Sequence, residues 1–96
     1  MRQQNYSYPL DPDWTTDEME TVIAFLRVVE DAYEIGAPRS KVLEKYRAFK
    51  KVVSSKAGEK QLGRQFAKNS GYQLYTVVKL ASMSQKKIIR WLMIND

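Results

Sequence analysis

The fold of this protein is organised around residues 15–36, TTDEMETVIAFLRVVEDAYEIG. Thr15 is a favourable N-cap residue, and Glu18 three positions later completes a capping box, so a helix is expected to begin here. Gly36 provides the left-handed residue at which helices commonly end. Apolar residues recur at intervals of three and four, which indicates one broad buried helix face. That face consists of Met19, Val22, Ile23, Phe25, Leu26, Val28, Val29, Ala32 and Tyr33.

Two further helices are expected after this one. Pro38 suits the first turn of a second helix, because the N–H that proline lacks is not needed there. Ser54 and Ser55 interrupt the pattern, and Ser55 can cap a third helix that ends at Gly71. The apolar side of the second helix consists of Val42, Leu43, Tyr46, Phe49 and Val53. The side chains predicted to be largely buried, in the middle of the first two helices, are Leu26, Val29, Tyr46 and Phe49.

The two ends of the chain complete the predicted architecture. Residues 73–94 are expected to be helical, either as one helix or as two, with Ser84 capping a second helix from Gln85. Pro9 and Pro12 disfavour helix for the residues before them, which predicts an extended arm over residues 1–14. No segment shows the alternation typical of a strand. The sequence therefore predicts an all-α fold: an N-terminal arm and one helical domain, residues 15–96, made of a compact array of three to five short helices.

The composition restricts the possible functions. The chain has 96 residues with neither cysteine nor histidine, so it lacks thiolate chemistry and the usual general base and metal ligand. A partial phosphate-loop pattern at residues 58–65 lacks the required Lys and Ser or Thr after its second glycine. Residues 1–8 contain no apolar stretch that would serve as a signal peptide, and the aliphatic run 22–26 is too short to span a membrane. We expect a cytoplasmic protein that is not an enzyme and has no cofactor, metal, membrane or small-molecule substrate.

Charge is distributed unequally along the chain. Residues 1–36 contain two basic and eight acidic side chains, whereas residues 37–96 contain fourteen basic and three acidic ones. Within the basic part, every fourth position of the third helix is a cation, which forms a basic row about 18 Å long. This row consists of Lys56, Lys60, Arg64 and Lys68. Together with Lys41 and Lys45 of the second helix, it is the candidate face for an anion or a nucleic acid.

Three explanations of the basic row are open at this point. The acidic first helix could neutralise it within one molecule, it could be a solvated face, or it could meet an anionic partner. Like charges four residues apart destabilise a helix by roughly 0.2–0.5 kcal/mol per pair, so a chain that keeps three such pairs either faces an anionic neighbour or tolerates a solvated strip. Aromatic residues that would stack on bases are not interleaved with the row, so a nucleic acid is supported by charge alone.

Large apolar residues at both ends of the chain form a candidate interaction surface. The arm contains Tyr6, Tyr8 and Leu10, and the C-terminal segment contains Trp91 and Met93. Exposed apolar groups of this size need to be covered. The favoured explanation for the arm is that it packs over its own helices, and the alternative is that it lies on a partner or on a second copy.

Three motifs resemble those of a known family. They are YSYPLDPDW at residues 6–14, YRAFK at 46–50, and the segment from SKA at 55–57 to SGY at 70–72. In this order they resemble a small uncharacterised bacterial family typified by YktA, over about residues 6–80. The resemblance implies a compact helical array of unknown function and assigns no catalytic residue. The third helix departs from the family by having Gly58, Ala67 and Lys68 where acidic residues are usual.

These observations favour a function based on binding. The first expectation is a non-catalytic protein-interaction or self-associating module, with a protein partner or a second copy as its ligand. The alternative is a nucleic-acid-associated protein that uses the basic face of the second and third helices. Salt separates the two, because binding to nucleic acid weakens steeply with salt whereas an apolar interface does not.

Overall fold

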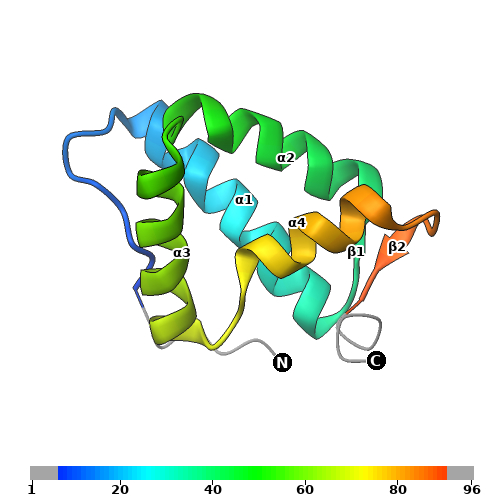
Figure 1. Ribbon diagram of the computed structural model, residues 1–96. Coiled ribbons are helices and arrows are strands. Elements are labelled where there is room, and N and C mark those ends of the chain that lie inside the picture. The colour runs from blue at the N-terminus through cyan, green and yellow to red at the C-terminus, as the bar shows by residue number, and fades with distance from the viewer. Residues whose placement is uncertain (1–6, 91–96) are drawn as a thin grey trace.

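The computed structural model describes residues 7–90, which form four helices and one pair of two-residue strands (Figure 1). The elements are α1 (Thr16–Glu34), β1 (Ala37–Pro38), α2 (Arg39–Val52), α3 (Lys56–Ser70), α4 (Leu74–Met83) and β2 (Ile88–Ile89). The all-α class is confirmed, with the small strand pair as an addition. None of the helices in this part of the chain has both the length and the apolar character needed to cross a membrane.

The two ends of α1 have the structure that the sequence predicts. The Thr15 hydroxyl accepts a hydrogen bond from the Glu18 amide (3.1 Å), and the Glu18 carboxylate accepts one from the Thr15 amide (2.8 Å). At the other end, Gly36 adopts a φ of +95°, and its amide and that of Ile35 both donate to the Asp31 carbonyl. The capping box and the glycine stop therefore define the central helix.

The core is built on α1, which lies between the other helices (Figure 1). Seven of its nineteen residues are buried, and its most extensive contacts are with α2. The Phe25 and Phe49 rings meet with centroids 4.7 Å apart. Leu26, Val29 and Phe49 are fully buried, as predicted. Tyr46 is only half-buried, because its hydroxyl reaches a polar partner, Glu59, at 2.9 Å.

The C-terminal part of the chain differs from the prediction. Ser84 is the C-cap of α4 and does not begin a helix, and Ile88–Ile89 pairs antiparallel with Ala37–Pro38. Pro38 accordingly lies in a strand just before α2, not in its first turn. Two contacts explain why α4 stops: the Arg39 side chain donates to the Ala81 carbonyl (2.6 Å), and the Arg39 amide donates to the Lys87 carbonyl (2.6 Å). Residues 91–94 of the predicted helix lie outside the described residues.

The central position of α1 predicts a large effect of shortening Leu26. Leu26→Ala is expected to lower the free energy of unfolding by about 2–5 kcal/mol, the usual range for a truncated core leucine. Ile35→Ala is a matched control, because Ile35 is 69% exposed at the end of the same helix. The control should change stability by no more than about 0.5 kcal/mol in chemical denaturation. A loss below about 1 kcal/mol for Leu26→Ala would contradict this description of the core.

The two left-handed glycines predict a second difference in stability. A Cβ atom on Gly36 would lie 3.0 Å from side-chain carbons of both Ile88 and Arg90, whereas one on Gly71 would meet nothing within 4 Å. Both residues have positive φ, so alanine at either position should cost about 1–2 kcal/mol. Gly36→Ala is expected to destabilise more than Gly71→Ala in thermal unfolding, because it also displaces β2. Equal losses of stability in the two variants would show that β2 moves aside without an energetic cost.

Candidate anion-binding groove

The helix that carries the basic row has one buried and one exposed face. Ser55 caps α3 by accepting from the Gly58 amide (3.0 Å), and Gly71 ends it with a φ of +83°. Leu62 and Phe66 point into the core. The opposite face exposes all four cations of the row, Lys56, Lys60, Arg64 and Lys68.

Three of these cations line a groove of about 790 Å³ between α2, α3 and α4. We call it the basic groove. Its charged lining consists of Lys50 from α2 and Lys56, Glu59, Lys60 and Arg64 from α3. Lys50 is not among the residues that the sequence analysis assigned to the candidate face. Of the other candidate residues, Lys68, Lys41 and Lys45 do not line the groove, so they form no single site with the other three.

Glu59 is the acidic residue of this lining, and its charge is already engaged. One of its oxygens accepts from the Lys50 ammonium (2.6 Å) and the other accepts from the Tyr46 hydroxyl (2.9 Å). Burial and this hydrogen bond to a carboxylate, together with the nearby Glu59 charge, raise the pKa of Tyr46 to about 12. Tyr46 therefore remains a neutral donor at neutral pH. The exposed cations of the groove retain a net positive charge.

The groove also contains an aromatic residue that the sequence analysis missed. Tyr75 of α4 lines it and is 62% exposed. The sequence analysis found no aromatic residue interleaved with the row along the chain, and Tyr75 reaches the groove from a different helix. The helical register of Leu74, Val77 and Ala81 already placed Tyr75 off the buried stripe of α4. Only the packing of α4 against α3 brings its ring beside the cations.

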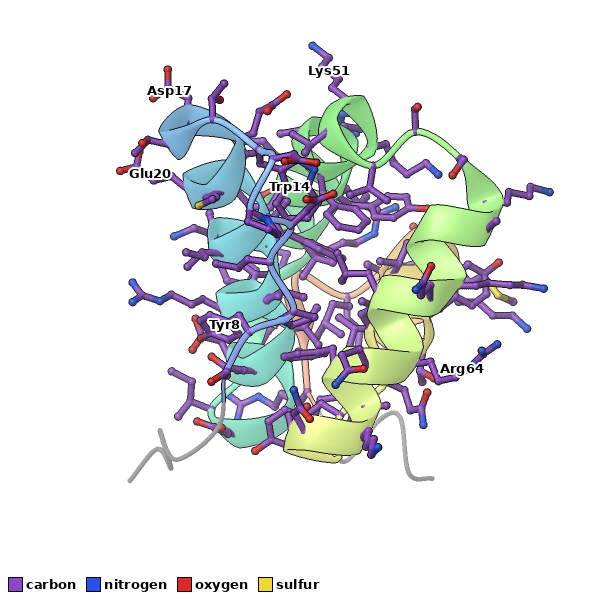
Figure 2. The ribbon with its side chains drawn as sticks, turned by 90° about the vertical axis from the view of Figure 1, so that its left-hand side faces the viewer. Tyr8, Trp14, Asp17, Glu20, Lys51 and Arg64 are labelled. Carbon is purple, nitrogen blue, oxygen red and sulfur yellow. The ribbon has the colours of Figure 1, made fainter. Side chains whose placement is uncertain are left out.

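The acidic first helix does not neutralise the basic row. Within residues 7–90, no ion pair joins a cation of the row to an acidic residue of α1. Glu30 is fully buried and accepts instead from the Tyr8 hydroxyl (2.8 Å). Figure 2 shows Asp17 and Glu20 at one edge of the molecule and Arg64 at the opposite edge. The charge asymmetry of the sequence is therefore also a separation in space.

The described part of the arm packs on its own helices. Tyr8 binds Glu30 of α1 and contacts the Phe66 ring of α3, with centroids 6.4 Å apart. Leu10 and Trp14 pack against the core, and Figure 2 shows the arm descending between α1 and α3. Tyr8 and Leu10, offered as interaction residues, are thus half-buried within the monomer. The other three candidates, Tyr6, Trp91 and Met93, lie outside the described residues.

Comparison with known proteins identifies the family. Residues 5–90 match the model of an "Uncharacterised protein family (UPF0223)". The chain is 48% identical to the UPF0223 protein str0998 of Streptococcus thermophilus over 89 residues. This aligned region covers 93% of this chain and 96% of that protein. It is 55% identical over 75 residues to the UPF0223 protein lmo1058 of Listeria monocytogenes, covering 78% and 83%. The chain belongs to the UPF0223 family, so the prediction of an uncharacterised bacterial family is confirmed.

The environment of Tyr46 predicts a dependence of stability on alkaline pH. The pKa of Tyr46 rises from 10.0 to about 12 on folding, so the unfolded chain loses this proton first. The contribution of Tyr46 to stability is therefore complete below pH 10 and is lost as the pH rises towards 12. We expect the free energy of unfolding to fall more steeply over this range in the wild type than in Tyr46→Phe. Glu59→Gln should lower the pKa of Tyr46, as read from tyrosinate absorbance, and an unchanged value would contradict the role of Glu59.

Proposed function

We propose that this protein is a non-catalytic binding module whose basic groove holds an acidic surface of a protein. The supporting observation is the groove itself, where cations from two helices, Lys50, Lys56, Lys60 and Arg64, line one cavity. Three of them are exposed. An acidic ligand would relieve the repulsion between cations one helical turn apart.

The chemistry of the groove supports binding rather than catalysis. The sequence has no histidine or cysteine to act as a general base or nucleophile near neutral pH. The Glu59 carboxylate is held by Lys50 and Tyr46, and Tyr46 titrates far above neutral pH. Amines and a guanidinium group remain, and these recognise negative charge. We also propose that the protein is cytoplasmic, which the absence of cysteine favours.

The spacing of the cations supports a regular acidic segment as the ligand. Lys56, Lys60 and Arg64 follow one another at about 6 Å along α3. Carboxylates at every fourth position of a helix repeat at the same distance, and those at alternate positions of an extended chain repeat at about 6.6 Å. Either arrangement would place one carboxylate opposite each cation.

A second candidate function is binding of single-stranded nucleic acid, and Tyr75 is the observation that favours it. Its ring is 62% exposed in the same groove as the cations. Stacking of one base on an aromatic ring contributes about 1–3 kcal/mol and tolerates any base. The cations would neutralise the phosphates, which makes this binding strongly dependent on salt.

The basic groove predicts the response of two probes to the same variant. Lys60→Gln/Arg64→Gln should weaken the binding of poly-glutamate about tenfold at low salt, measured by fluorescence anisotropy. Lys86→Gln/Lys87→Gln removes the same charge outside the groove and should have a much smaller effect. The Lys60→Gln/Arg64→Gln protein should be as stable as the wild type, or more stable by roughly 0.2–0.5 kcal/mol for each pair of cations whose repulsion is relieved. Equal losses in both variants would overturn the groove as the binding site.

Tyr75→Ala separates the two candidate functions. If an acidic protein is the ligand, this change should alter poly-glutamate affinity by no more than about twofold, because the contacts are ionic. If single-stranded nucleic acid is the ligand, the same change should weaken oligothymidine binding about tenfold through the lost stacking. Oligothymidine binding that is tighter than poly-glutamate binding and depends on Tyr75 would replace the first proposal by the second.

A further inference from the structure

We propose that the acidic partner of the basic groove is a second copy of this chain. The second copy would present what we call the acidic end, namely Asp13 in the turn before α1 and Asp17 and Glu20 at the start of α1. This inference rests on the proposed function, because it uses the same groove and names its occupant. It goes beyond that function by assigning both surfaces of the contact to one sequence.

The acidic end is exposed and held on a rigid element. Asp13, Asp17 and Glu20 are all exposed, and Figure 2 shows the side chains of Asp17 and Glu20 pointing away from the molecule. The capping box of Thr15 and Glu18 fixes the first turn of α1 without using any of these three carboxylates. In the part of the chain that the structure describes, no ion pair engages Asp17 or Glu20. The acidic end is therefore available to another molecule.

One molecule cannot bring its own two surfaces together. The acidic end lies at the N-terminus of α1, whereas the basic groove lies between α2, α3 and α4, and Figure 2 places Glu20 and Arg64 at opposite edges. Both surfaces are carried on helices whose other faces are buried in one core. Each surface can therefore meet its opposite charge only on another molecule. A second copy of this chain carries both surfaces, so it always offers the opposite charge.

The two surfaces match in spacing and character. Asp17 and Glu20 are separated by about 4.5 Å along α1, and Lys60 and Arg64 by about 6 Å along α3. The long stems of lysine and arginine accommodate this difference, since their charged groups move while the stem lies on apolar surface. The two surfaces are also opposite in charge, with three exposed carboxylates on one and three exposed cations on the other.

Because the two surfaces are different, their contact is heterologous. A heterologous contact leaves one free surface at each end of a dimer, so it continues into rings or open chains. Association should therefore increase with protein concentration beyond the dimer. It should also weaken with salt, because exposed charges are screened within about 8–10 Å at physiological ionic strength.

Neutralising one surface at a time tests this arrangement by sedimentation velocity. The acidic-end variant is Asp17→Asn/Glu20→Gln, and the groove variant is Lys60→Gln/Arg64→Gln. At low salt the wild type should form species larger than a dimer, and each variant alone should associate about tenfold more weakly. An equimolar mixture should form a heterodimer and nothing larger, because only one complementary pair of intact surfaces remains.

Matched controls and the probe experiment separate the possible failures. The Glu44→Gln and Lys86→Gln/Lys87→Gln variants change charge outside both surfaces, so they should self-associate like the wild type. Circular dichroism checks that every variant is folded. If the equimolar mixture sediments no faster than its separate components, the proposal that a second copy is the partner is overturned. A wild type that stays monomeric while poly-glutamate binds its groove also overturns it but leaves the proposed function intact. If poly-glutamate does not bind the groove, the proposed function is wrong as well.

Discussion

Burial of the broad apolar face of α1 is the constraint on which the rest of this structure depends. Phe25, Leu26 and Val29 are fully removed from water, and this requires cover on several sides of one helix. α2 makes the most extensive contacts with α1, including that of the Phe49 ring with Phe25, and α4 and the arm pack against the same core. A chain of about 100 residues has only one core, so the loss of this helix would leave the other elements without a surface to pack on.

The same constraint explains why the charged surfaces are exposed. Leu62 and Phe66 turn one face of α3 towards the core, which directs its cations outward. Asp17 and Glu20 at the start of α1 lie outside its buried stripe, so these two carboxylates also remain in water. The Glu30 carboxylate, which is fully buried, accepts a hydrogen bond from the Tyr8 hydroxyl. The packing of apolar faces thus separates the carboxylates at the start of α1 from the cations of α3.

Polar contacts between distant segments determine the details of the groove. Glu59 joins Lys50 and Tyr46 of α2 to α3, although nine to thirteen residues separate these partners in sequence. The contact links the two helices beside the groove, and the Lys50 ammonium offsets the negative charge of Glu59, which would oppose an anionic ligand. A burial pattern alone classed Tyr46 as a core residue. In the structure the Tyr46 ring packs against the core, while its hydroxyl donates to Glu59 at the groove.

Local interactions were readable from the residues alone: the Thr15 and Glu18 capping box, the Ser55 cap, and the stops at Gly36 and Gly71 all depend on neighbours within a few positions. Helical periodicity also placed the four cations of the basic row on one face of α3, whereas the sequence left open whether an acidic helix covers that face. The end of α4, the pairing of β1 with β2, and the meeting of Tyr75 with the row were decided only by tertiary contacts. The Arg39 side chain reaches a carbonyl 42 positions away, and no local pattern records such a distance. Periodicity states which face of a helix is covered, but the identity of the covering element depends on how all the apolar faces pack together.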